Sequence, residues 1–224
     1  MTGTTGAAAS GPSAGESGPS PRVDAPDRDA LDELVSSAQA GDLPSFNRIV
    51  LRFQDRVYGL SLRMLGSPEA AEDVAQETFI RAYRRLETFR GGKFDSWLLT
   101  IAANLSRDEL RRRGRRPQTS LDAARDDPGR ADLDPPDRGE TPGDAAERGD
   151  LRRVLQDALL ELPEDWRTIV ILSDVEGLAY QEIVDATGLA LGTVKSRLSR
   201  ARGRLRDILR ASGELDGMIE RLNQ

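Results

Sequence analysis

Apolar residues recur every three or four positions over most of the chain, which is the spacing of one buried face of an α-helix. In the first half this pattern predicts four helices, over about residues 29–41, 42–66, 67–86 and 94–113. Ser67 followed by Pro68 is typical of a helix N-terminus, because serine can cap the first turn and proline has no N–H to leave unpaired. No stretch alternates between apolar and polar residues as a strand does, so we expect an all-α fold.

The second half contains a shorter helical block, from about residue 149 to residue 212. Its first helix is predicted to end at Leu162–Pro163, and its second to cover residues 164–175. A short periodic stretch then stops at Gly188, and a longer one covers Leu191–Arg210. A short helix, a tight turn and a basic helix in this order are typical of a helix-turn-helix.

Composition changes sharply between the two helical blocks. Proline and glycine recur over residues 117–148, apolar residues almost vanish, and ten Asp and Glu stand against four Arg between Gln118 and Asp150. Such a stretch is typical of a flexible, solvated acidic linker. We therefore predict two small helical domains, residues 29–116 and 149–212, joined by this linker. We expect a disordered N-terminal tail over residues 1–28 and a C-terminal tail over residues 213–224.

The absence of two residue types narrows the classes of function. The chain has no Cys, which excludes disulfides and thiolate metal sites, and no His, the commonest general base and metal ligand. We therefore expect neither an enzyme nor a bound cofactor. No run approaches the roughly 18 apolar residues of a membrane span, and the N-terminus lacks the pattern of a secretory signal. We expect a cytoplasmic protein without membrane insertion.

The helix predicted at 191–210 is strongly cationic, although the whole chain has a formal net charge of −6. It has seven basic residues and one acid, and its apolar positions form a single narrow face. Such a helix can dock in the major groove of DNA through side chains near its N-terminus. The candidates for contact with bases and phosphates are Thr193, Lys195, Ser196, Arg197, Ser199 and Arg200. The alternative is an ordinary solvated amphipathic helix.

Two segments of the first half carry further candidate nucleic-acid contacts. Residues 104–116 contain six arginines against two acids, which form either a DNA-binding face or a charge cluster favourable at a helix C-terminus. In the loop at 88–97, Phe89 and Phe94 are placed to stack on an unpaired base while Arg90 and Lys93 hold its strand. The alternative for the aromatic residues is packing in the core.

An acidic stripe lies on the helix predicted at 67–86. Its members are spaced by three or four residues and therefore share one face: Glu69, Asp73, Gln76 and Glu77. The stripe would repel phosphate. It is either a solvated face paired with nearby arginines or a docking surface for a basic protein partner. A catalytic carboxylate pair is a third alternative, but no nucleophile, base or metal ligand accompanies it.

Four motifs in this order resemble those of bacterial sigma factors of the extracytoplasmic-function (ECF) class: D-V-A-Q-E-T-F-I-R-A-Y-R-R-L, F-D-S-W-L-L-T-I-A-A-N-L-S-R-D-E-L-R-R-R, L-P-E-D-W-R-T-I-V-I-L-S-D-V-E-G-L-A-Y-Q-E-I and G-T-V-K-S-R-L-S-R-A-R. The resemblance covers about residues 29–211 without the linker. It implies a region 2 domain followed by a region 4 helix-turn-helix. It also implies a non-enzymatic factor that binds core RNA polymerase and directs promoter-specific transcription initiation.

The resemblance further implies partners and residue roles. The β′ coiled coil of core RNA polymerase would contact Asp73, Gln76 and Glu77, and the β flap would be a second contact. The promoter −35 element would be recognised by the six candidates on the basic helix, and the −10 element by Phe89, Arg90, Lys93, Asn104, Arg107, Arg111 and Arg112. An anti-sigma factor is a further expected partner. From the second half alone, the alternative is a conventional dimeric helix-turn-helix transcriptional regulator.

Overall fold

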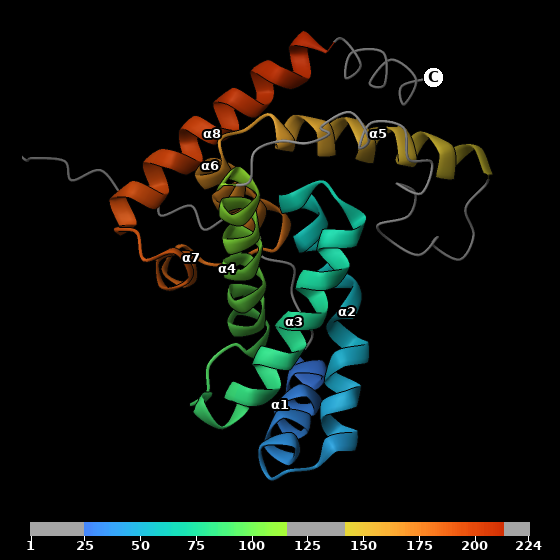
Figure 1. The fold of residues 1–224 in the computed structure, drawn as a ribbon, viewed down its shortest axis with the longest axis vertical. Coiled ribbons are helices and arrows are strands. Elements are labelled where there is room, and N and C mark those ends of the chain that lie inside the picture. Colours follow the sequence, from blue (N-terminus) through green and yellow to red (C-terminus); the bar gives the residue numbers. More distant parts are fainter. Residues whose placement is uncertain (1–24, 116–141, 213–224) are drawn as a thin grey trace, which may run out of the picture.

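The computed structural model describes residues 25–115 and 142–212, and the secondary structure in these ranges is entirely helical (Figure 1). The first range forms α1 (Ala25–Gln39), α2 (Leu43–Leu65), α3 (Pro68–Arg85), the 3-10 turn η1 (Leu86–Thr88) and α4 (Phe94–Arg115). The second range forms α5 (Pro142–Leu160), α6 (Glu164–Val170), the π-helical turn η4 (Ile171–Val175), α7 (Tyr180–Thr187) and α8 (Leu191–Ala211). The all-α prediction is confirmed over both ranges.

Local capping chemistry sets the boundaries of α2 and α3. The side chain of Asp42 accepts a hydrogen bond from the Ser45 N–H at 3.0 Å, which caps the start of α2. Gly66 ends α2 in the left-handed conformation, with φ of 69°. The Ser67 hydroxyl then accepts from the Ala70 N–H at 3.3 Å and starts α3. These signals act within a few residues of each other, so the sequence could predict them.

Some predicted boundaries were wrong. Helix α1 begins at Ala25, a few residues before the predicted start. Helix α5 begins at Pro142, inside the segment expected to be linker; proline in the first turn and acids soon after it suit a helix N-terminus. The helix expected at 164–175 changes from α to π geometry at Ile171. The rest of the predicted tails and linker, residues 1–24, 116–141 and 213–224, lies outside the described residues.

We call α1–α4 lobe 1 and α5–α8 lobe 2. In lobe 1, α2, α3 and α4 pack on one another and α1 packs on α2. Fully buried side chains of lobe 1 include Val57, Leu60 and Leu98, each with no exposed surface. In lobe 2, α8 packs on α5, α6 and α7. Both lobes are therefore built by burying one apolar stripe of each helix.

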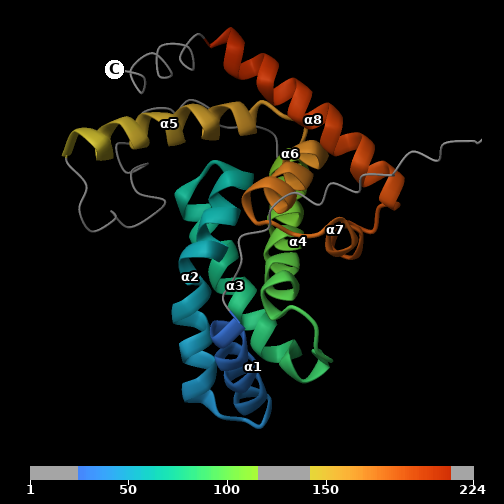
Figure 2. The same cartoon turned by 180° about the vertical axis from the view of Figure 1, so that it is seen from behind.

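The two lobes are not held apart but pack against each other. Helix α7 contacts α4, and α5, α6 and η4 contact α2. Seen from both sides, α5 crosses beyond the ends of α2 and α3, and α7 lies beside α4 (Figures 1 and 2). Buried apolar residues from both lobes belong to one continuous cluster. The arrangement positions the charged segments of the two lobes next to one another.

Candidate polymerase and nucleic-acid interfaces

The acidic stripe on α3 forms one wall of a groove between α3 and α4. Three of its members line this groove: Glu69, Asp73 and Glu77. Asp73 and Gln76 are exposed, whereas Glu77 is half-buried and accepts a hydrogen bond from Arg81 Nε at 2.7 Å. Intrahelical pairing therefore neutralises part of the stripe, and Asp73 and Gln76 remain on the surface.

The opposite wall of the groove comes from the basic end of α4. Glu109 accepts hydrogen bonds from Arg112 Nε at 2.7 Å and from Arg113 Nε at 2.8 Å. The hydrogen bond from Arg112, joined by the one from Arg113, lowers the pKa of the Glu109 carboxyl. The same hydrogen bond to Glu109 raises the pKa of the exposed Arg112 guanidinium, and the Asp73 carboxylate across the groove adds to this in the same direction. Residues predicted to bind polymerase thus face residues predicted to bind the −10 element across one groove.

The loop between η1 and α4 combines an exposed tip with a packed aromatic base. Gly91 and Gly92 adopt φ of 99° and 96°, and no atom lies within 4 Å of where their side chains would start. The ring of Phe89 packs on Phe94 at 5.5 Å and on Trp97 at 5.4 Å between centroids. Phe94 is only 2% exposed and belongs to the core, so the prediction that it stacks on a base was wrong. Core packing also describes much of the half-buried Phe89 ring, while the loop tip beside it stays open.

The remaining lobe 1 candidates differ in exposure. Arg90 and Asn104 are exposed, and Arg111 is exposed and pairs with Asp108 at 3.4 Å. Lys93 and Arg107 instead point to lobe 2. Lys93 Nζ lies 3.3 Å from a Glu182 carboxylate oxygen, and Arg107 Nη2 lies 3.8 Å from Asp165. The structure thus separates the lobe 1 cations into an outward-facing set and a set held at the contact between the lobes.

Helices α7 and α8 form the predicted helix-turn-helix. Gly188 ends α7 in the left-handed conformation, with φ of 70°, and α8 starts three residues later. A buried seam holds α8 on its lobe, formed by Val194, Leu198, Ala201 and Ile208. The exposed side of its first half presents Lys195, Ser196, Ser199 and Arg200. Thr193 and Arg197 are half-buried, and Arg197 Nη1 donates to Asp165 at 2.6 Å.

Sequence reasoning missed the acidic residues that meet these cations. Asp165, Glu176 and Glu182 lie on α6, after η4 and on α7, among many other acids of the chain. Nothing in their spacing distinguishes them, because their partners lie far away in the sequence. Among the described residues, no cluster of carboxylates is arranged to hold a metal ion, and no helix is long and apolar enough to cross a membrane.

Two family models match the chain in the order in which its lobes occur. Sigma-70 region 2 matches residues 49–116, and Sigma-70, region 4 matches residues 152–205. Among curated relatives, the chain is 41% identical to the ECF RNA polymerase sigma factor SigE of Mycolicibacterium smegmatis over 167 residues, which are 75% of this chain and 62% of that protein. It is 36% identical to the ECF RNA polymerase sigma factor SigW of Bacillus subtilis over 185 residues, which are 80% of this chain and 97% of that protein.

Two solved structures share the arrangement of helices. CnrH in complex with the cytosolic domain of CnrY matches with a TM-score of 0.58 and 28% identity, over 82% of this chain and 99% of CnrH. The sigma factor RpoE in complex with the anti-sigma factor NepR from Bartonella quintana matches with a TM-score of 0.57 and 26% identity, over 75% of this chain and 98% of the matched chain. The likeness covers both lobes in each case.

Proposed function

We propose a division of roles within this chain, which belongs to the ECF sigma factors: lobe 1 and lobe 2 contact separate promoter elements while the acidic stripe holds RNA polymerase. As a member of this family it is an alternative sigma factor that binds core RNA polymerase and directs promoter-specific transcription initiation. What remains to be tested is which residues carry each contact.

Lobe 2 reads the −35 element through α8. The observation that carries this assignment is the exposed set Lys195, Ser196, Ser199 and Arg200, presented by a helix whose opposite side is buried. Serine and charged side chains near the N-terminal end of such a helix can reach base edges and phosphates in the major groove. Thr193 and Arg197 would complete the surface, Arg197 after it leaves Asp165.

Lobe 1 contacts the −10 element with the loop tip and the outward side of α4. The backbone at Gly91 and Gly92 is open to a ligand, and Arg90 beside it is exposed. Phe89 would support this loop from below while its ring stays packed on Trp97. Asn104, Arg111 and Arg112 continue along α4 and would hold the sugar-phosphate backbone. Lys93 and Arg107 belong to this surface only when they are free of lobe 2.

Core polymerase binds the acidic stripe. Asp73 and Gln76 are exposed on α3, and Glu77 adjoins them. Carboxylates on a helix suit a basic coiled coil such as the one expected from the β′ subunit. The β flap is the proposed contact of lobe 2. We propose no catalytic role for these carboxylates, because arginines hold both Glu77 and Glu109.

The decisive experiment is transcription with purified core RNA polymerase on fragments of the source genome. Run-off transcripts that start at a common sequence only when this chain is added would support the assignment. Transcripts that start at the same places with and without the chain would overturn it. Tight binding to a symmetric operator without polymerase would instead favour a dimeric regulator. In such a regulator, lobe 1 and its acidic stripe would need another role.

An anti-sigma factor is a proposed partner, because both structural relatives described above were solved as complexes, one of them with an anti-sigma factor. We also propose that the chain acts in the cytoplasm, where RNA polymerase is found. Co-purification of the tagged chain from its source, followed by identification of stoichiometric partners, tests both points. Recovery of polymerase subunits with one additional small protein is the expected result.

A further inference from the structure

Two consecutive glycines leave the tip of the loop between η1 and α4 conformationally free, so the ends of the loop must set its position. Gly91 and Gly92 have φ of 99° and 96°, a backbone region that favours glycine, and no other part of the described chain lies within 4 Å of where their side chains would start. Such a loop loses conformational entropy when it closes on a ligand. Contacts that fix its two ends before binding reduce that cost.

The entrance of the loop is held by one side chain from α1. Gln39, the last residue of α1, donates from Nε2 to the Leu86 carbonyl at 2.9 Å and to the Phe89 carbonyl at 2.8 Å. Leu86 begins η1, and Phe89 directly follows its end, where the chain leaves the turn in an extended conformation. One amide group therefore spans the whole of η1 and fixes the point from which the loop departs.

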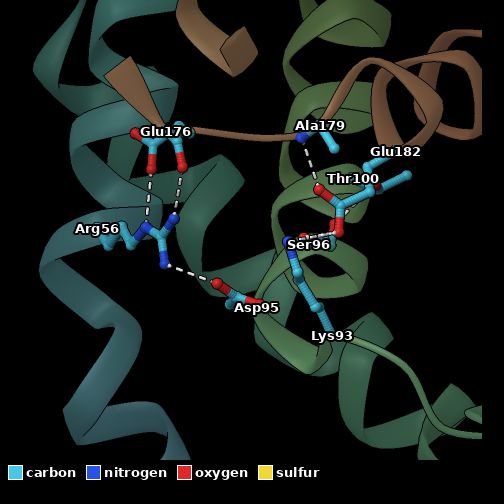
Figure 3. Close-up of polar contacts among 8 residues, drawn as sticks. All are labelled: Arg56, Lys93, Asp95, Ser96, Thr100, Glu176, Ala179 and Glu182. Carbon is cyan, nitrogen blue, oxygen red and sulfur yellow. Dashed lines mark hydrogen bonds and ion pairs between the residues drawn. The ribbon is translucent and has the colours of Figure 1, made fainter. Parts of the chain in front are cut away.

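The exit of the loop is held by a different set of contacts. The Lys93 carbonyl accepts a hydrogen bond from the Trp97 N–H at 3.1 Å, in the first turn of α4. Lys93 Nζ lies 3.3 Å from a Glu182 oxygen of α7, and the same carboxylate accepts from Ser96 Oγ at 2.9 Å (Figure 3). The exit therefore depends in part on lobe 2. The contacts of Gln39 lie wholly within lobe 1 and do not depend on lobe 2.

Removal of the Gln39 amide would leave the entrance of the loop without its donor. Leu86 is 2% exposed, and Phe89 is half-buried with its ring on Trp97 at 5.4 Å between centroids. A carbonyl that loses its donor in such surroundings costs free energy until it reaches water. When the Phe89 carbonyl turns toward water, the backbone rotates at that point, and Arg90 and the two glycines are redirected with it.

We propose that Gln39 is a positioning residue for the −10 element: its two hydrogen bonds hold the loop in the shape that accepts an unpaired base of the promoter strand. The inference rests on the proposed assignment of this loop to the −10 element. Gln39 acts through the backbone of Leu86 and Phe89 and does not itself contact DNA. Without it, only a fraction of the molecules has the loop in the binding shape, and the apparent affinity falls by that fraction. Because base contacts specify and backbone contacts only position, the loss falls on discrimination between −10 sequences.

The test uses holoenzyme reconstituted from core RNA polymerase and full-length variants of the chain. Gln39→Met removes the donor but keeps the length of the side chain and its neutral charge. Gln39→Lys restores a donor of similar length, because an ammonium group can donate to both carbonyls. Gln54→Met is the matched control, the same substitution at an exposed position of α2. The probe is a DNA fork with a duplex −35 element and a single-stranded non-template −10 strand, taken from a promoter identified by start-site mapping.

The measured quantity is the ratio between the affinity for the native fork and the affinity for forks in which each −10 base is substituted in turn. Gln39→Met should lower the largest of these ratios by about two- to tenfold, the size expected for the loss of a hydrogen bond. Gln39→Lys and Gln54→Met should keep the ratio of the wild type. A merely structural role of Gln39 would leave fewer folded molecules, which weakens binding to every fork alike and does not change the ratio.

An unchanged ratio in Gln39→Met, or an equal loss in Gln39→Lys, would overturn the inference. If circular dichroism shows that Gln39→Met does not fold, Gln39→Asn takes its place, because its amide is shorter by a methylene group and cannot span both carbonyls. Failure of the proposed function gives a different result. A wild-type holoenzyme that binds all −10 strands equally would remove the loop from the −10 contact, whereas a wild type and a Gln39→Met variant that discriminate equally well would remove only Gln39.

Discussion

Arg200→Ala is the substitution that isolates DNA recognition most cleanly from folding. Arg200 is exposed in the first half of α8, on the side away from the seam of Val194, Leu198 and Ala201. Within the described residues it joins no ion pair, unlike Arg197 and Arg202 of the same helix. A surface substitution of this kind changes the free energy of unfolding by only about 0.5 kcal/mol or less. Any larger loss measured in promoter binding therefore belongs to the DNA contact.

The expected size of that loss depends on what Arg200 contacts. An arginine that reads a base edge contributes about 1–3 kcal/mol, which is roughly a 5- to 150-fold loss of occupancy confined to promoters carrying the preferred base. An arginine that contacts only phosphate weakens all sequences alike and lowers the salt dependence of log K by about one unit. The two cases are separated by measuring affinity at several salt concentrations on promoters that differ in the −35 element.

The assay is binding of the reconstituted holoenzyme to promoter fragments identified by start-site mapping. Arg206→Ala provides the matched control, because Arg206 is also exposed on α8 but lies about 9 Å further along the helix. Arg200→Ala should lose affinity and Arg206→Ala should lose much less. If both variants bound every promoter as the wild type does, Arg200 would take no part in recognition of the −35 element.

Three further predictions concern the acidic stripe, the groove and the core. Glu77→Lys should weaken binding to core polymerase by about tenfold or more, because it places a cation on a surface proposed for a basic partner. The control is Glu72→Lys, an equal charge change at an exposed position of α3, which should bind nearly as the wild type does. A pull-down with core enzyme measures both. The pKa of Glu109 is lowered in the folded state, so its contribution to stability is present above its ordinary pKa of 4.5 and is lost as pH falls through the lowered value. In urea titrations between pH 6 and pH 3, the free energy of unfolding should fall more steeply in the wild type than in Glu109→Gln. Parallel curves would contradict this. Ile169→Ala should reduce the free energy of unfolding, measured by urea denaturation, by about 2–5 kcal/mol, because the Ile169 side chain has no exposed surface. A change below about 1 kcal/mol would show that the site is not packed as described.

The candidate site could be predicted in part. The exposed side of α8 follows from helical periodicity, since the apolar seam of the same helix fixes which residues face outward. The face shared by Asp73 and Glu77 follows from the same spacing. Phe89 could not be assigned, because an aromatic residue beside a glycine loop serves equally well for stacking and for packing. The ring contacts with Phe94 and Trp97 show how much of it is core.

The sequence by itself determined the positions of most helices, the cap at Ser67 and the helix-turn-helix, because each depends on chemistry between residues a few positions apart. Only the tertiary structure decided which charges meet. Glu176 pairs with Arg56 across 120 positions of sequence, and Asp165 lies between Arg107 and Arg197. A chain with 38 acids and 32 bases allows very many such pairs, and composition favours none of them. Packing of α7 on α4 and of η4 on α2 selects the few that form, because burial of the apolar faces fixes where the charges lie.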